Sequence, residues 1–100
     1  MTNDQIQTLA DIQRMALISV PGQTGQQTRH ELNTFTDGGA WSAVGVYDSS
    51  NAPLYYSRVS IEADGTEMPK PGDPDSPCTL SEQHTQLAEW IAANRQKVAA

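Results

Sequence analysis

The chain has 100 residues, a formal net charge of −6 at pH 7 and only six Lys and Arg residues. This length predicts a single domain over residues 1–100 with a modest core. The charge argues against direct binding to nucleic acid or to an anionic membrane, because both require Lys and Arg to neutralise phosphates. The basic residues are scattered along the sequence. An acidic surface favours basic protein partners, although solubility alone is the plainer explanation.

Cysteine content and the N-terminal sequence indicate the compartment. The single cysteine, Cys78, excludes an internal disulfide and a metal site built from several cysteines. The first residues lack the basic and apolar segments of a signal peptide. The longest apolar run, Met15 to Ile18, is too short to span a bilayer. We therefore expect a cytoplasmic protein that does not enter the membrane.

Residues 3–18 have the apolar spacing of an amphipathic helix. Thr2 or Asn3 can cap its first turn, and Pro21 ends it near Ile18. The apolar arc of this helix comprises Ile6, Leu9, Ala10, Ala16 and Leu17, with Ile12 at its edge. We expect this arc to pack on a sheet.

A polar loop is expected over Pro21–Thr28, and three strand-like segments follow it. They cover Arg29–Thr36, Trp41–Tyr47 and Leu54–Ala63. The first alternates weakly, the second is apolar on both faces as a central strand is, and the third alternates clearly. Two turn sequences separate them, Asp37-Gly38-Gly39 and the Asp-, Ser- and Asn-rich residues 48–53. This pattern predicts a three-stranded antiparallel meander.

The segment from Glu62 to Glu82 contains six carboxylates and one Lys, so six minus one gives five of the six net negative charges. Four prolines exclude a helix or a central strand from much of it. Thr79 and Glu82 fit a capping box at the start of a final helix that runs to about Lys97. The expected fold class is α+β: a three-stranded antiparallel meander flanked by N- and C-terminal helices (α-β-β-β-α).

His84 and Cys78 are the best candidates for catalysis. Cys78 precedes a helix N-terminus, which can activate a thiol, but a Cys–His pair also needs an orienting group and oxyanion donors, and no glycine-rich elbow accompanies this one. One of the few possible zinc sites would join His30, His84 and Cys78 from three segments, and prolines interrupt any calcium loop around Asp73 and Asp75. We therefore predict no enzyme, no cofactor and no metal, with a small enzyme using Cys78 and His84 as the weakest alternative.

Two groups of residues are predicted to contact a partner. They are the acidic Glu62, Asp64, Glu67, Asp73 and Asp75, and the aromatic Tyr47, Tyr55 and Tyr56. Tyrosine is a favoured interface anchor, and alternation places Tyr55 and Tyr56 on opposite faces of their strand. In an extended chain Asp73 and Asp75 would stand roughly 6–7 Å apart, which is about the spacing of successive phosphates in a nucleic-acid strand.

These residues favour a protein that binds another protein without turnover. We expect a small acidic modulator or inhibitor, of the kind that phages and mobile elements encode, that occludes the basic nucleic-acid-binding surface of a partner protein. The alternative is a structural or assembly subunit that oligomerises through its sheet or helix faces, and the sequence does not exclude a homodimer.

Overall fold

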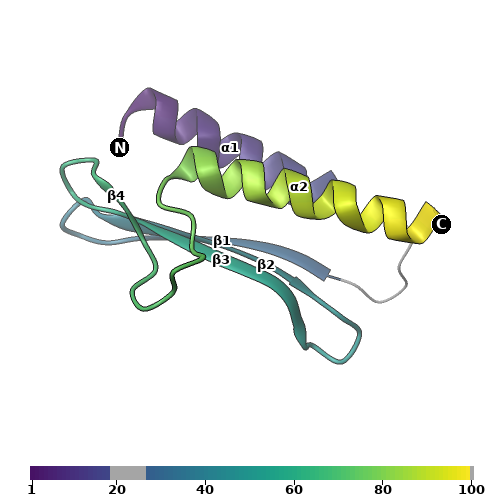
Figure 1. Ribbon diagram of the computed structural model, residues 1–100. Coiled ribbons are helices and arrows are strands. Elements are labelled where there is room, and N and C mark those ends of the chain that lie inside the picture. The colour runs from purple at the N-terminus through teal and green to yellow at the C-terminus, as the bar shows by residue number, and fades with distance from the viewer. Residues whose placement is uncertain (19–26, 100) are drawn as a thin grey trace.

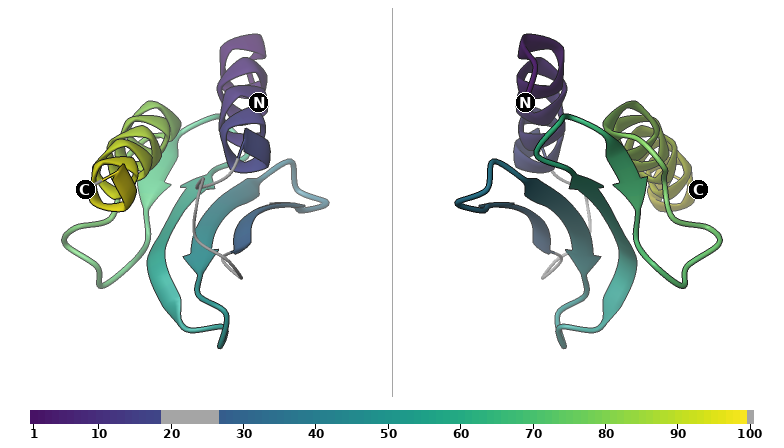
Figure 2. Two further views of the ribbon diagram at one scale, coloured as in Figure 1. Left: turned by 90° about the vertical axis from the view of Figure 1, so that its right-hand side faces the viewer. Right: turned by 90° about the vertical axis from the view of Figure 1, so that its left-hand side faces the viewer.

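The computed structural model describes residues 1–18 and 27–99, with side chains described as far as residue 93. Two helices, α1 (Asn3–Ile18) and α2 (Leu80–Ala99), lie on one face of an antiparallel sheet (Figures 1 and 2). The sheet has the order β1 (Gln27–Thr34), β2 (Ala40–Tyr47), β3 (Pro53–Ile61) and β4 (Glu67–Pro69). The predicted α+β class, with an antiparallel meander between two helices, is confirmed.

The prediction of three strands is wrong by one, because the acidic segment contains β4. This short strand pairs with the end of β3, where Ile61 lies opposite Glu67 and Val59 opposite Pro69. Three residues are too few for alternation to reveal a strand, and a proline is tolerated at the sheet edge. The loop predicted over Pro21–Thr28 lies mostly outside the described residues, and its last two residues begin β1.

All three hairpins use the same turn. In each, one residue has positive φ: Gly38 (92°), Asn51 (67°) and Gly65 (92°). In each, a backbone N–H before the turn donates to the carbonyl four residues later, as from Phe35 to Gly39. Within each turn an aspartate carboxylate, that of Asp37, Asp48 or Asp64, accepts a backbone N–H. These are the features of three-residue hairpin loops with a left-handed final residue, so the order of the strands is determined by local sequence.

The core fills the space between the sheet and the helices. Its buried residues form two clusters: Ile12, Val44, Val46, Leu87 and Ile91, and Leu9, Ala40, Val59, Ile61 and Leu80. Helix α1 buries Leu9, Ile12 and Ala16, whereas Ile6, Ala10 and Leu17 of the predicted apolar arc are exposed. At about 100° per residue, the exposed line of Ile6, Ala10 and Leu17 lies roughly a quarter-turn around the helix from the buried line of Leu9, Ile12 and Ala16.

Glu67 connects β4 to the N-terminal ends of both helices. Its carboxylate accepts hydrogen bonds from the Leu80 N–H (2.5 Å), in the first turn of α2, and from Gln5 Nε2 (3.1 Å) in α1. Gln5 also donates to the Gly65 carbonyl (2.7 Å) and forms a capping box with Thr2. A carboxylate is well suited here because the first N–H groups of a helix have no partner within the helix.

We expect Glu67→Ala to lower the free energy of unfolding by about 2 kcal/mol, because two donors then lose a charged acceptor. Urea denaturation measures the loss. Glu62→Ala is the matched control: Glu62 is exposed, its carboxylate bonds no described residue, and its loss should stay within about 0.5 kcal/mol. Equal losses in the two variants would contradict the role assigned to Glu67.

Candidate protein-docking groove

A groove of about 520 Å³ opens beside the first half of β3. β4 pairs only with Val59–Ile61, so it leaves that half of β3 uncovered. The groove is lined by Tyr55 and Tyr56 of β3, Asp73 and Asp75 of the loop before α2, and Gln86, Glu89 and Trp90 of α2. Figure 1 shows this loop extending from β4 past the sheet before α2 begins. Three aromatic rings and three carboxylates thus meet from three separate segments. No described Lys or Arg is part of the lining, although Lys70 lies over the ring of Tyr56 (5.2 Å to its centroid).

The two tyrosines point to opposite sides of β3, as alternation predicts. Tyr55 faces the helices and packs against Trp90 with ring centroids 5.9 Å apart. Its hydroxyl lies 3.4 Å from Gln86 Oε1, to which it donates. Burial raises the pKa of Tyr55 above its ordinary value of 10.0. Tyr56 lies on the open face and is 42 % exposed.

The loop that carries Asp73 and Asp75 is folded into turns. Asp73 Oδ1 accepts the Asp75 N–H (3.0 Å), and the Asp73 carbonyl accepts the Ser76 N–H (3.2 Å). Ser76 Oγ accepts the Lys70 N–H (3.1 Å) and donates to the Arg58 carbonyl of β3 (3.3 Å). The extended chain assumed for a phosphate-like spacing of the two carboxylates is therefore wrong. Both carboxylates line the groove instead.

The other residues predicted to contact a partner lie elsewhere. Glu62 and Asp64 belong to the β3–β4 turn beside the N-terminus of α1, where the Thr66 N–H donates to Asp64 and lowers its pKa. Glu67 is bonded to both helices as described above. Tyr47 lies on the open face of the sheet. The predicted acidic surface is thus two separate groups, and sequence reasoning missed Glu89 and Trp90, which α2 brings beside Asp73 and Asp75.

The sheet face opposite the helices collects three of the six basic residues. Each lies over an aromatic ring: Arg29 over Tyr47 (4.6 Å to the ring centroid), Arg58 over Trp41 (5.8 Å) and Lys70 over Tyr56 (5.2 Å). Cations are attracted to ring faces at these distances. Three basic residues that are far apart in the sequence are therefore grouped on one face of the sheet.

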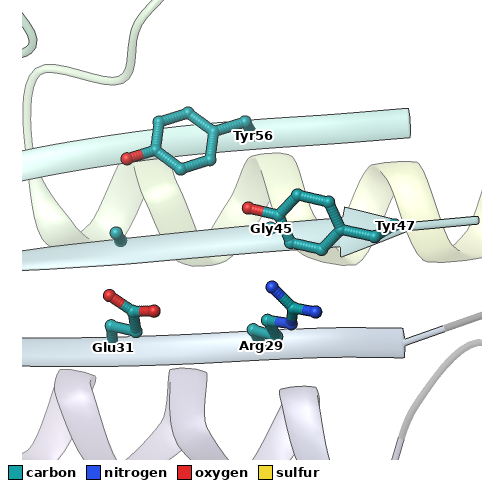
Figure 3. Close-up of a pocket in the computed structure, with 6 residues that line it drawn as sticks. Arg29, Glu31, Gly45, Tyr47 and Tyr56 are labelled. Carbon is teal, nitrogen blue, oxygen red and sulfur yellow. The ribbon is translucent and has the colours of Figure 1, made fainter. Parts of the chain in front are cut away.

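Gly45 makes room on this face for the ring of Tyr47. A Cβ at position 45 would come within 2.6 Å of that ring. The result is a shallow hollow of about 220 Å³, whose lining includes Arg29, Glu31, Tyr47 and Tyr56 (Figure 3). Arg29 and Glu31 lie side by side along β1 at its border.

A chain of hydrogen bonds crosses the helix–sheet interface and includes His30 instead of His84. Gln83 of α2 donates to the Ser42 carbonyl (3.0 Å) and the Ser57 carbonyl (3.4 Å), and its oxygen accepts the Ser42 hydroxyl (3.0 Å). Ser42 Oγ lies 2.9 Å from His30 Nε2, and His30 Nδ1 lies 2.8 Å from Gln13 Oε1. Because Ser42 donates its proton to Gln83, it must accept one from His30 Nε2. Nδ1 of the neutral ring is then an acceptor, so the Gln13 amide must present its NH₂ group to it.

This order of serine, histidine and amide resembles a hydrolase triad, but it cannot act as one. Ser42 is 0 % exposed, so no substrate reaches its hydroxyl. Its proton is also committed to Gln83, whereas a nucleophile must transfer its proton to the histidine. The chain of bonds therefore serves to hold the helices on the sheet.

Cys78 and His84 are not joined by a hydrogen bond. The Cys78 thiol is exposed, and its backbone N–H donates to the Glu82 carboxylate (2.7 Å) in the first turn of α2. His84 lines a hollow between the helices with Asp11, Arg14 and Met15. Within residues 1–18 and 27–99, no three His, Cys, Asp or Glu side chains are grouped so that they could hold a metal ion.

Comparison with known proteins finds no matching family model, no similar curated protein and no similar solved structure. In the described part of the chain, no helix combines the length and the apolar character needed to cross a membrane. Function must therefore be inferred from the chemistry of the groove and the sheet.

Burial lowers the pKa of His30 below its ordinary value of 6.5. The unfolded chain then binds a proton at this site more readily than the folded protein. The free energy of unfolding should therefore be highest, as far as His30 is concerned, above about pH 6.5 and should decrease as the pH falls below that value. Urea midpoints measured between about pH 7.5 and pH 5 test this. We expect His30→Gln to have a weaker pH dependence than the wild type, and His84→Gln, which leaves His30 in place, to retain it. An unchanged dependence in His30→Gln would refute the assignment.

Proposed function

We propose that the protein binds a basic segment of another protein in the groove between β3, the loop before α2, and α2. The observation that carries the proposal is the lining itself, in which three aromatic rings and three carboxylates surround one groove. An Arg or Lys side chain is stabilised both by the face of an aromatic ring and by charged hydrogen bonds to carboxylates. Tyr and Trp are also frequent anchors at protein interfaces.

Two of the three carboxylates are available to a ligand. Neither the Asp75 nor the Glu89 carboxylate accepts a hydrogen bond from a described residue, and Asp73 is oriented by the Asp75 N–H. The groove therefore combines one carboxylate positioned by the loop with two that can turn toward a guanidinium or an ammonium group. An arginine suits it best, because its planar group both stacks on rings and donates to two acceptors.

The partner class that fits this chemistry is a protein with an exposed Lys- and Arg-rich surface. Nucleic-acid-binding proteins have such surfaces because they neutralise phosphates. By occupying that surface, this protein would act as an inhibitor or modulator of nucleic-acid binding. Its net charge of −6 would accelerate the encounter with a basic partner.

The test compares two variants with the same net charge. Asp73→Asn, Asp75→Asn and Glu89→Gln together remove three negative charges from the groove, and Asp4→Asn, Asp11→Asn and Glu62→Gln remove three elsewhere, so each variant changes −6 to −3. The probe is a fluorescein-labelled arginine-rich peptide, followed by anisotropy. We expect the groove variant to bind about tenfold or more weakly, and the control to lose about threefold or less, since only the groove contacts are short-range.

Trp90 provides an independent readout. Trp41→Phe leaves Trp90 as the only tryptophan of the chain, so a change in its emission on adding the peptide reports occupancy of the groove. Affinity should fall as salt rises from about 0.05 M to about 0.5 M. Equal weakening in the groove and control variants, or a silent Trp90, would show that the peptide binds to general negative charge, and the groove would lose its proposed role.

A further inference from the structure

We infer that the free edge of β1 pairs with β1 of a second copy of the chain, so that two copies form one eight-stranded sheet. β1 is the first strand of the order β1-β2-β3-β4, and no described strand pairs with its outer edge. The backbone groups, the charges and the apolar surface at this edge can each pair with the same feature of an identical edge. This inference is independent of the groove, which lies on the far side of the sheet beside β3 and α2.

The backbone of β1 determines which residues can face the second copy. The Phe35 N–H donates to the Gly39 carbonyl (2.8 Å), so Phe35 directs its groups toward β2. Because the direction alternates along a strand, Thr28, His30, Leu32 and Thr34 direct their N–H and C=O groups toward the free edge. Pairing two such edges places one of these residues opposite another. Opposite residues share a sheet face, so both copies then have their helices on the same side.

Charge selects one register among those that the backbone permits. Arg29 and Glu31 lie on the open face of β1, two residues apart (Figure 3). With a two-fold axis at His30, Arg29 of each copy lies opposite Glu31 of the other. Moving the axis to Arg29 or to Glu31 would place like charges opposite each other, which is unfavourable. In the favoured register, Arg29 and Glu31 of the two copies form a pair that does not exchange backbone hydrogen bonds. In antiparallel sheets the side chains of such pairs lie closest together.

Arg29 and Glu31 can each form further hydrogen bonds or ion pairs beyond those in the single chain. Glu31 forms no hydrogen bond or ion pair with the described residues. Arg29 donates from Nη2 to Gln27 Oε1 (2.9 Å) and Asn51 Oδ1 (3.2 Å), which leaves Nε and Nη1 for another acceptor. The stacking on Tyr47 holds the guanidinium on the open face but over β2 (Figure 3), so it must swing toward the free edge to meet Glu31 of a second copy.

The surface above this edge is apolar, as a stable interface requires. Ile6 and Leu17 of α1 are 52 % and 75 % exposed, and Leu32 of β1 is 45 % exposed. Ile6, Ala10, His30 and Leu32 belong to the lining of a hollow of about 290 Å³ between α1 and β1. Pairing of the two edges brings this hollow and its copy to the same side of the joined sheet. The exposed line of α1 that a single chain leaves uncovered thereby gains an apolar neighbour.

Charge reversal at the edge tests the register directly. By light scattering and sedimentation the wild type should have twice the 10.9 kDa mass of the single chain. Arg29→Glu and Glu31→Arg each place like charges opposite each other at both sites, and each should raise the dissociation constant about tenfold or more. The double variant Arg29→Glu/Glu31→Arg should dimerise like the wild type. An equimolar mixture of the two single variants should form heterodimers more readily than either variant forms homodimers.

Two further variants separate edge pairing from other effects. Glu62→Arg makes the same change of charge as Glu31→Arg far from the edge, and it should remain dimeric. Thr28→Pro removes an N–H that points to the free edge, so circular dichroism should show a folded chain that no longer dimerises. The inference is overturned if the wild type stays at 10.9 kDa up to about 1 mM. It is equally overturned if the single reversals dimerise as well as the wild type, or if mixing them gives no gain.

Discussion

One chain of hydrogen bonds, which starts at the surface and ends in the core, connects every large element of the fold. It runs from Gln13 of α1 through His30 of β1 and Ser42 of β2 to Gln83 of α2, which also bonds the Ser57 carbonyl of β3. Burying an amide without hydrogen-bond partners would raise the free energy of the folded state. Because Gln83 is fully buried, this cost favours the position of α2 in which these bonds form. That position places Gln86, Glu89 and Trp90 beside β3. The groove therefore depends on a polar contact that lies outside it.

The elements with local signals could be predicted from the sequence. Glycine and aspartate mark the turns at residues 37–39 and 63–66, where a positive φ is required. Thr79 accepts the Glu82 N–H (3.1 Å) as its spacing predicts, and α1 ends at Ile18, the predicted position. β4 could not be predicted, because a strand of three residues is too short to show alternation of apolar and polar residues. The whole apolar arc of α1 was expected to pack on the sheet, and half of it is exposed, because helical spacing does not reveal how wide a face the sheet covers.

The candidate site required the tertiary structure. Tyr55, Asp75 and Trp90 come from three segments, and their meeting depends on how α2 lies across the sheet. The interior bonds had a signal that was available: Gln83 lies three residues after Leu80 and four before Leu87, on the buried line of α2. Ser42 and Ser57 likewise alternate in phase with Val44 and Val59. A polar residue in phase with buried neighbours can therefore be a sign of a buried hydrogen bond and need not mark a surface position.

The topology also determines the order in which the core can close. Each strand pairs with its neighbour in sequence, so the β1–β2–β3 meander can form as soon as the chain is available through Ile61. Only α1 can then cover Val44, Val46 and Val59, through Ile12 and Leu9, because α2 follows the sheet in the sequence. During synthesis the ribosome therefore releases a paired sheet with an apolar face before it releases the helix that covers this face. In that interval the sheet exposes apolar surface that favours aggregation, and addition of the 20-residue α2 is the step that covers it.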